Sequence, residues 1–270
     1  MKRLLFLAHR IPYPPDKGDK IRSYREWKAL VDEFDVTLAC FIDDPADEAH
    51  LPFLREHFRE VIAVPLKPLP AKLRSLAGLL GNKPLSLAYY ADSTMRRLVS
   101  EAAARAPFDV VWVFSSQVAP YADCAPNTRR ILDLCDLDSE KWLQFADASG
   151  PPKSWLYSLE GKRLGKYEVE LASRFDATLL VSPAEARTLS ERSPGSRVEV
   201  VPNGVDLDFL DPAPFDGVTV DHQTCCFCGY MDYLSNIDAV KFFHDDVLPL
   251  VRREMPDARF KIIGANPAPE

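Results

Sequence analysis

Three short polar stretches of the sequence could carry chemistry, and the first of them surrounds a glycine. Lys17-Gly18-Asp19-Lys20 follows an apolar run and opens a segment with helical character. A glycine lets backbone N–H groups approach an anion, and the N-terminal end of a helix dipole favours negative charge. The stretch therefore predicts an anion-binding loop, with an ordinary glycine turn and solvated charges as the alternative.

The other two stretches each follow an apolar run further along the chain. They are Ser115-Ser116-Gln117 and Cys135-Asp136-Leu137-Asp138-Ser139. A carboxylate could orient or deprotonate a hydroxyl group, which makes Asp136 the first candidate for a catalytic residue and Asp138 the second. The competing interpretation is that these aspartates cap a helix that begins near Ser139.

The elements that must position these stretches alternate along the chain. Short runs typical of strands are separated by longer segments typical of helices, which predicts βαβ units around a parallel sheet covered on both faces. Such doubly wound sheets bind ligands at the carboxyl ends of their strands, so the three stretches should line one cleft. The predicted strands are residues 3–8, 36–42, 61–65, 110–114, 130–134, 177–181 and 198–201, and the main predicted helices are 19–31, 93–106, 154–174 and 183–191.

A stretch rich in Pro, Gly and Asp interrupts this rhythm. Val201-Pro202-Asn203-Gly204-Val205-Asp206 and Asp211-Pro212-Ala213-Pro214 have the chemistry of turns. The next segment holds one βαβ unit, with strands at 223–228 and 259–263 and a helix at 236–253, about half or less of an independent α/β domain. We therefore expect a first Rossmann-like domain over 1–201, a linker over 202–217 and the start of a second domain over 218–270.

Composition excludes several classes of protein. The chain has 270 residues and a formal net charge of -7, which argues against a nucleic-acid partner because such proteins need a basic face. The apolar run Leu4–Ala8 is too short for a secretion signal. No run approaches the roughly 18 apolar residues of a membrane span. We expect a cytoplasmic protein without a cofactor.

The cysteines raise one metal hypothesis. Cys225, Cys226 and Cys228 are close together, but strand alternation would send Cys225 to the opposite face from the other two. No second Cys or His pair follows them, as a structural zinc site would require. We therefore expect a buried strand with free thiols and no metal.

Several motifs, in order along the chain, resemble those of glycosyltransferase family 4. Val201–Asp206 with Phe209 resembles the family's interdomain motif, and Val181-Ser182-Pro183-Ala184-Glu185 matches an element upstream of it. The opening Arg10–Ser23, together with Gly229–Tyr233 and Asn236–Val240, looks more specifically like the sugar transferases associated with exosortase and PEP-CTERM exopolysaccharide systems.

The resemblance implies a GT-B-like fold, in which two Rossmann-like domains face each other, with the acceptor on the first and a nucleotide-sugar on the second. It also implies a retaining transfer in which the leaving diphosphate can accept the proton, so that no protein nucleophile is required. Many members have a His where this chain has Cys135, and their Lys/Arg pair and E-x7-E element do not occur before Glu270. The residues implied in substrate binding are Lys17, Gly18, Asp19, Arg22, Ser115, Ser116, Asn203, Gly204, Gly229, Met231 and Gly264, the last with a plain strand-ending turn as its alternative.

Residues 66–84 combine regularly spaced leucines with basic side chains. A basic amphipathic helix of this kind can lie on anionic lipid, which would suit a lipid-linked acceptor at the inner face of the cell membrane. Packing of the leucines on their own domain gives the same pattern and is the more frequent case, so packing is our prediction and peripheral membrane contact the alternative. The residues are Leu66, Leu69, Leu73, Leu76, Leu79 and Leu80, with Lys67, Lys72, Arg74 and Lys83.

The leading hypothesis is a transferase that moves a hexose-type sugar from a nucleotide-sugar donor to a lipid-linked polysaccharide acceptor. One alternative is a non-catalytic acceptor-binding or assembly module, because most of the donor-binding motifs are absent. Another is a GT-B sugar-nucleotide epimerase, whose acid pairs are not recognisable here. A lone βαβ piece would leave an open sheet edge and an uncovered apolar face, so we also expect self-association through the second domain.

Overall fold

The computed structural model describes residues 1–207, 210–211, 217 and 219–267. The chain divides into two compact units, Met1–Gly204 (unit 1) and Val205–Glu270 (unit 2). Phe209 of the interdomain motif and residues 212–214 of the predicted linker lie outside the described residues. Among the described helices, none is both long enough and apolar enough to cross a bilayer.

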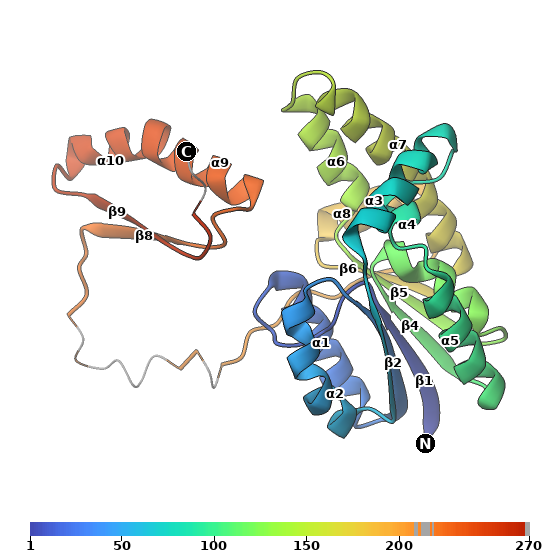
Figure 1. Ribbon diagram of the computed structural model, residues 1–270. Helices are drawn as coiled ribbons and strands as arrows, with labels where there is room; N and C mark the ends of the chain where they lie inside the picture. The colour runs from blue at the N-terminus through green and yellow to red at the C-terminus, as the bar shows by residue number, and fades with distance from the viewer. Residues whose placement is uncertain (208–209, 212–216, 218, 268–270) are drawn as a thin grey trace. The chain divides into compact units, whose positions relative to one another are not determined.

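Unit 1 is built on a parallel seven-stranded sheet in the order β3-β2-β1-β4-β5-β6-β7 (Figure 1). The order runs outward from β1 and β4 in opposite directions, which is the mark of a doubly wound sheet. The predicted Rossmann-like α/β fold is therefore confirmed. The strands are β1 (Lys2–Ala8), β2 (Phe34–Ile42), β3 (Glu60–Pro65), β4 (Val110–Phe114), β5 (Arg129–Cys135), β6 (Ala177–Leu180) and β7 (Val198–Val200).

Helices cover both faces of this sheet because its strands are apolar on both faces. Leu4 and Phe6 of β1 pack in one buried cluster with Trp27, whereas Leu5 and Leu7 belong to a second cluster. Successive side chains of a strand point to opposite faces, so a continuous apolar run suits a sheet buried on both sides. The helices are α1 (Gly18–Leu30), α2 (Leu51–His57), α3 (Pro68–Ala77), α4 (Leu85–Tyr89), α5 (Ser93–Arg105), α6 (Asp138–Asp147), α7 (Lys153–Arg174) and α8 (Pro183–Arg192), with 3-10 helices at Pro45–His50, Gly78–Leu80 and Ser116–Cys124.

The segment 66–84 differs from the prediction that its leucines pack on their own domain. Leu66 is buried, but four of the five other leucines of this segment face outward. The prediction is wrong for Leu69, Leu73, Leu76 and Leu80, which are 70%, 59%, 60% and 97% exposed. The reason is that α3 approaches the rest of unit 1 through its small residue Ala71, which is fully buried, and through polar contacts of Arg74 and Ser75.

Unit 2 pairs β8 (Thr224–Cys228) with β9 (Arg259–Ile263) in parallel. Between them lie α9 (Leu234–Phe242), a π-helical turn (Phe243–Val247) and α10 (Leu248–Glu254), where a single helix was expected. Pro249 has no N–H to continue the α-helical hydrogen bonds, which accounts for the irregular turn before α10.

The cysteine-rich strand of unit 2 also differs from expectation. Cys225, Cys226 and Cys228 have free thiols, as predicted, but all three are exposed within unit 2. The expectation of a buried strand is wrong because a sheet of two strands has too few neighbours to bury both its faces. Within the described residues, no group of three His, Cys, Asp or Glu side chains could hold a metal ion.

Candidate active site

The carboxyl ends of β1, β4 and β5 meet at one edge of the unit 1 sheet. β1 ends at Ala8, β4 at Phe114 and β5 at Cys135, and the three strands run parallel to one another. The strand order reverses between β1 and β4, and open α/β sheets bind their ligands at such a switch point. The structure thus brings the three polar stretches to one edge of the sheet.

The backbone is strained where β4 and β5 reach this edge. Ser115 has a φ of 83° and Cys135 a φ of 64°, in a region that L-residues other than Gly rarely adopt. The pairing of β5 with β6 shifts register between Asp133 and Cys135. Strain of this kind costs about 1–3 kcal/mol per residue and collects at functional sites, so both residues support a site here.

The first of two charged clusters at this edge is the inner cluster, formed by Arg22, Glu26 and Asp133. Arg22 Nε donates to Asp133 Oδ2 at 2.7 Å and lies 3.4 Å from Glu26 Oε1. Asp133 is fully buried, and its Oδ1 accepts the backbone N–H of Cys135 at 2.7 Å. Trp112 Nε1 donates to Glu26 Oε2 at 3.0 Å. These contacts tie α1 to both β4 and β5.

Burial controls the acidity of the inner cluster. It raises the pKa of Glu26 well above its usual range, the adjacent Asp133 raises that pKa further, and Arg22 opposes the shift. Burial lowers the pKa of Arg22, but the hydrogen bond and charge of Asp133 outweigh it, so the Arg22 pKa is raised. Glu26 therefore holds its proton to a higher pH than an exposed glutamate does.

Arg22 also holds the end of unit 1. Its Nη1 donates to the carbonyl oxygen of Val201 and to Oδ1 of Asn203, each at 2.9 Å. A hollow of about 320 Å³ opens at this point, and four of the predicted substrate-binding residues share it: Gly18, Arg22, Asn203 and Gly204. Through these contacts Arg22 positions the walls of the hollow, and its Nη2 is buried without a hydrogen-bond partner.

The N-terminal end of α1 is open at Gly18. A Cβ atom at this glycine would meet nothing within 4 Å, and Lys17 just before it is exposed. The bare glycine leaves space beside the N-terminal end of α1, as an anion-binding loop requires. The binding of an anion by residues 17–18 stays a prediction.

Asp19 is engaged by the loop that follows β1. Its Oδ2 lies 3.3 Å from His9 Nε2 and 3.1 Å from Arg10 Nη1. Burial by itself would raise the pKa of Asp19, but the hydrogen bond from His9 and the charge of Arg10 hold that pKa well below its usual range. His9 in turn stacks on Phe114 at the end of β4, with ring centroids 5.8 Å apart. Asp19 thus fixes the β1–α1 loop against β4.

The second charged cluster is the outer cluster, formed by Asp136, Asp138 and Lys141. Lys141 Nζ lies 2.9 Å from Asp136 Oδ2 and 3.3 Å from Asp138 Oδ1, and the three side chains are 33–38% exposed. Burial lowers the pKa of Lys141, but the two carboxylates outweigh it and raise that pKa. Gln117 Nε2 donates to Asp138 Oδ2 at 3.2 Å, which joins the stretch after β4 to the stretch after β5. Ser115 and Ser116 are buried beside them.

Glutamates from other helices cap α6, in place of the two aspartates. Glu185 accepts the backbone N–H of Leu137 at 3.1 Å, and Glu168 accepts that of Ser139 at 3.1 Å as well as the Ser139 hydroxyl. The capping interpretation of Asp136 and Asp138 is therefore wrong. Burial raises the pKa of Glu168 to about 7 and raises that of Glu185. Because the caps come from elsewhere, the outer carboxylates are left to face the open edge.

Sequence reasoning missed several residues of this edge. Glu185 was noticed only as part of a family motif, and Glu168 and Glu26 gave no signal because each looks like an ordinary charged position on a helix. His9 directly follows a predicted strand, and that position could have marked it as a site residue. Arg22, predicted to bind substrate, donates to Asp133 and to the carbonyl oxygen of Val201, and its role toward a substrate stays a prediction.

The predicted residues of unit 2 form a group of their own at the carboxyl ends of β8 and β9. The backbone N–H of Gly229 donates to the carbonyl oxygen of Ile263 at 3.0 Å. The backbone N–H of Met231 donates to the carbonyl oxygen of Ala265 at 2.9 Å. A Cβ atom at Gly264 would lie 1.8 Å from the carbonyl oxygen of Gly229, so this position accepts only glycine. These two N–H groups are engaged, and a ligand at this end would use other donors of the loops.

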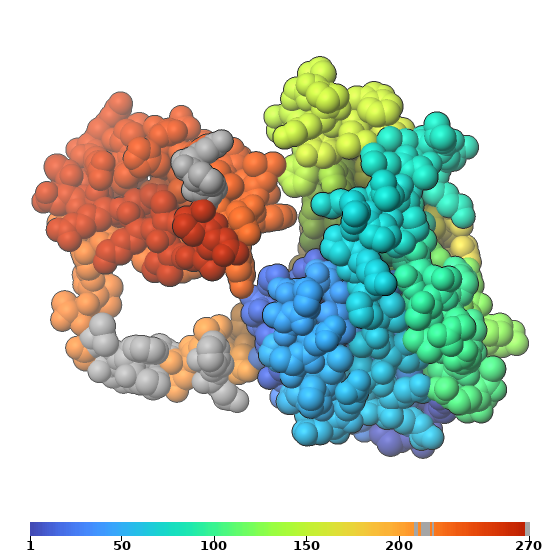
Figure 2. Space-filling model, viewed as in Figure 1, coloured from blue at the N-terminus to red at the C-terminus, as the bar shows by residue number. Residues whose placement is uncertain are grey.

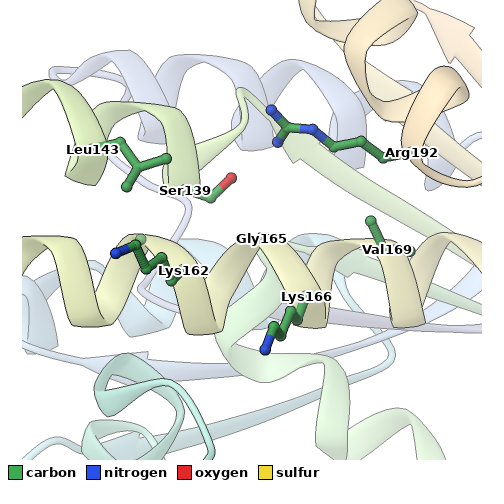
Figure 3. A pocket seen from close by; sticks show the side chains of 8 residues that line it. Ser139, Leu143, Lys162, Gly165, Lys166, Val169 and Arg192 are labelled. Atoms are coloured by element: carbon green, nitrogen blue, oxygen red, sulfur yellow. The ribbon is translucent and has the colours of Figure 1, made fainter.

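A second hollow of unit 1, about 420 Å³, lies between α6 and α7 (Figure 3). Arg192 points toward Ser139 on one side of α7, whereas the amino group of Lys166 lies on the other side. Arg192 is already paired with Glu140 at 2.7 Å. Because its polar groups do not converge, this hollow is a weaker candidate for a polar ligand than the edge described above.

Comparison with known proteins agrees with the fold. No curated protein matches the sequence. A sucrose-phosphate synthase from Thermosynechococcus elongatus is similar in structure, with a TM-score of 0.61, 11% identity, and coverage of 99% of this chain and 71% of that one. An alpha,alpha-trehalose-phosphate synthase (UDP-forming) from Burkholderia vietnamiensis gives a TM-score of 0.56 and 14% identity over 99% of this chain and 65% of that one.

These identities are low enough that the two structures establish likeness of fold alone. The family assignment comes from the sequence, where a model of the glycosyl transferase 4-like domain matches residues 22–204. The match contains the inner and outer clusters and ends at Gly204, the last residue of unit 1. The chain therefore belongs to the glycosyl transferase 4-like family.

Proposed function

We propose that the protein is a retaining glycosyltransferase that moves a hexose-type sugar from a nucleotide-sugar to a lipid-linked exopolysaccharide acceptor. The observation that carries this proposal is the convergence of Gly18, Ser115 and Asp136 at the switch point of the unit 1 sheet, on a strained backbone. Family membership supports the reaction type. The resemblance of residues 10–23 to PEP-CTERM-associated transferases supports the acceptor class and the inner face of the cell membrane as the place of work.

The open N-terminus of α1 is assigned to a phosphate group of the donor or acceptor. Uncovered N–H groups and the helix dipole favour an anion at Gly18, and Lys17 adds an exposed positive charge. Arg22 sets the shape of this place by holding Val201 and Asn203. The nucleotide itself is assigned to the carboxyl ends of β8 and β9 in unit 2, around Met231.

Asp136 is assigned to the acceptor hydroxyl group, with Asp138 as its second. In the transfer the bond between the anomeric carbon and the diphosphate oxygen breaks, and a bond from that carbon to the acceptor oxygen forms. The acceptor proton goes to the departing diphosphate, so the carboxylate orients the hydroxyl and need not keep its proton. Lys141 fixes the direction of both carboxylates.

The test is a panel of nucleotide-sugars offered with and without glycan acceptors. We expect one nucleotide-sugar to stabilise the protein, by about 2.7 kcal/mol when its concentration is a hundredfold above the dissociation constant. We also expect sugar transfer, with the anomeric configuration retained when the product is followed by NMR. Stabilisation by an acceptor glycan with no turnover of any donor would instead identify a binding module, and conversion of the donor alone would identify an epimerase.

Substitution locates the chemistry. Asp136→Asn should lower the rate of transfer about tenfold or more, because an acceptor hydroxyl that is poorly oriented reaches the reactive geometry less often. Asp147→Asn is the matched control, since it removes an exposed carboxylate at the C-terminal end of α6, the helix that begins two residues after Asp136. Equal rates for the two variants would remove Asp136 from the proposed mechanism.

A further inference from the structure

We infer that α3 docks unit 1 on an anionic lipid bilayer, with Leu69, Leu73, Leu76 and Leu80 inserted among the lipids. These four residues are called the leucine stripe. The docking does not depend on the proposed sugar transfer, and it can be tested without any sugar donor.

The leucine stripe is a continuous apolar face that points away from the protein. Spacings of four and three residues place Leu69, Leu73 and Leu76 on one side of α3, and Leu80 follows in the 3-10 turn. All four are more than half exposed, and Ala71 on the opposite side is fully buried. In Figure 2 the part of the chain that contains α3 lies on the surface of unit 1. A contiguous exposed patch of this kind marks a place of interaction, whereas single exposed leucines do not.

The protein holds this stripe outward through contacts on the inner side of α3. Arg74 Nη2 donates to the carbonyl oxygen of Tyr89 at 3.1 Å, and Ser75 Oγ donates to that of Leu85 at 2.9 Å. Glu160 of α7 is buried and accepts the backbone N–H groups of Leu85 at 2.6 Å and Ser86 at 3.0 Å. The stripe is therefore fixed in place by the fold.

Arg163 of α7 supports the end of the stripe. Its guanidinium donates to the carbonyl oxygens of Gly78 at 3.0 Å and Leu79 at 3.1 Å, and also to that of Gly81. These carbonyl groups lie at and just beyond the 3-10 turn that contains Leu80. The inner side of α3 and the turn after it are therefore anchored to the protein, and no structural contact of the described residues uses the exposed leucines.

The charges beside the stripe identify the partner. Lys67, Lys72 and Lys83 are exposed along this segment, and residues 66–90 contain no Asp or Glu. The whole chain has a net charge of -7, so this basic segment is opposite in sign to the net charge of the protein. Leucines flanked by lysines suit an anionic bilayer, in which apolar side chains reach the acyl chains while ammonium groups meet the headgroups.

A second copy of the chain is a poorer occupant of the same face. A twofold dimer pairs equal surfaces, and pairing of two leucine stripes would bring the lysines of one copy near those of the other. An anionic surface neutralises these charges instead. The position of α3 also suits a lipid-linked acceptor, because α3 follows the carboxyl end of β3, at the edge of the sheet that carries the candidate site.

The experiment is co-sedimentation of the full chain with vesicles at low salt. Vesicles of phosphatidylcholine alone are compared with vesicles of phosphatidylcholine and phosphatidylglycerol. We expect binding to the vesicles that contain phosphatidylglycerol and release at high salt, because screening weakens the attraction of exposed charges. Failure of the wild-type protein to bind these vesicles at low salt would overturn the inference.

Two sets of variants separate the contributions. Leu73→Ser with Leu76→Ser should lower the vesicle partition coefficient about tenfold per leucine, because each loses its apolar transfer energy. Leu234→Ser with Leu250→Ser on unit 2 is the control, since these leucines are similarly exposed, at 55% and 54%.

The second set replaces Lys67, Lys72 and Lys83 with Gln. Each replacement should lower vesicle binding about fivefold. The control for this set replaces Lys2, Lys28 and Arg55 with Gln, which removes the same amount of charge from exposed positions on other elements.

Equal losses in the test and control variants would overturn the assignment to α3. Light scattering decides against the bilayer in another way. A second copy would cover the leucine stripe if three results came together. The wild-type protein would be a dimer, the variant with Leu73→Ser and Leu76→Ser would be a monomer, and the wild-type protein would not bind vesicles. Circular dichroism of each variant must match the wild type, and we expect that it will because the substituted side chains are exposed.

Discussion

The inner and outer clusters adjoin the same end of β5, yet they differ in burial and in what they contact. Asp133 of the inner cluster is fully buried and paired with Arg22, whereas the carboxylates of Asp136 and Asp138 in the outer cluster are about one third exposed. Among the described residues, the inner cluster contacts groups on α1, β4, β5 and the segment after β7, while Arg22 Nη2 and Glu26 Oε1 are buried without a hydrogen-bond partner. The outer cluster is held by one lysine and one glutamine.

This difference indicates that the inner cluster fastens elements of unit 1 together, whereas the outer cluster is accessible for chemistry. Charges that are buried and paired with each other, as Arg22 and Asp133 are, cannot easily take part in a reaction with a substrate that arrives from solvent, and breaking the pair is costly. Carboxylates that are oriented and still accessible can. We therefore expect substitutions in the inner cluster to act mainly on stability, and substitutions in the outer cluster to act mainly on transfer.

The largest effect should come from Arg22→Met. Loss of the guanidinium leaves Asp133 buried without its partner, which should lower the free energy of unfolding by about 3–5 kcal/mol. Urea denaturation followed by tryptophan fluorescence measures this, because all four tryptophans lie in unit 1. Arg25→Met removes an exposed guanidinium from the same helix and should cost less than about 0.5 kcal/mol. Similar losses in both variants would contradict the fastening role.

The second-largest effect concerns Glu168, whose capping of α6 leaves the Asp136 and Asp138 carboxylates without that role. The pKa of Glu168, which caps α6, is raised by burial to about 7 from an ordinary 4.5. The folded protein therefore binds a proton more tightly here than the unfolded chain does. The stability from this group is complete below the unfolded pKa and is lost as pH rises through about 7, on the order of 3 kcal/mol in all.

Glu168→Gln removes this titration and keeps an acceptor for Ser139. Relative to the wild type, the variant should gain stability as pH rises from about 4.5 to about 7, where the wild type loses it. Urea denaturation across that range provides the measurement. Glu170→Gln, an exposed position on the same helix, should leave the difference from the wild type constant. A constant difference for Glu168→Gln as well would show that the glutamate does not titrate in this window.

The fold could be predicted from the sequence because the strands are buried on both faces. Such strands are continuous apolar runs bounded by polar residues, and Val110–Phe114 was predicted with the bounds that the structure has. The prediction that the leucines of α3 pack on their own domain was wrong for a physical reason. Periodicity shows that a helix is amphipathic, but it does not show which face contacts the protein.

The candidate site could be predicted only in part, for a related reason. Strand ends are local features, so the stretches at Gly18, Ser115 and Asp136 were found. The partners of charged side chains are set by tertiary structure, and Arg22 meets Asp133 and Asn203 from 111 and 181 residues away. Nothing local distinguishes a guanidinium that binds substrate from one that holds two segments together.

The smallest effect on stability should come from Lys141→Met in the outer cluster. An ion pair this exposed contributes at most about 1 kcal/mol, because water screens it and long side chains must be ordered. Transfer should nevertheless fall, since Asp136 and Asp138 lose the group that sets their direction. Arg97→Met is the control because it breaks an exposed pair with Glu101, 2.8 Å apart, on a different helix. The two variants should match in urea denaturation and differ in the rate of sugar transfer, and equal transfer rates would return the outer cluster to the role of a surface ion pair.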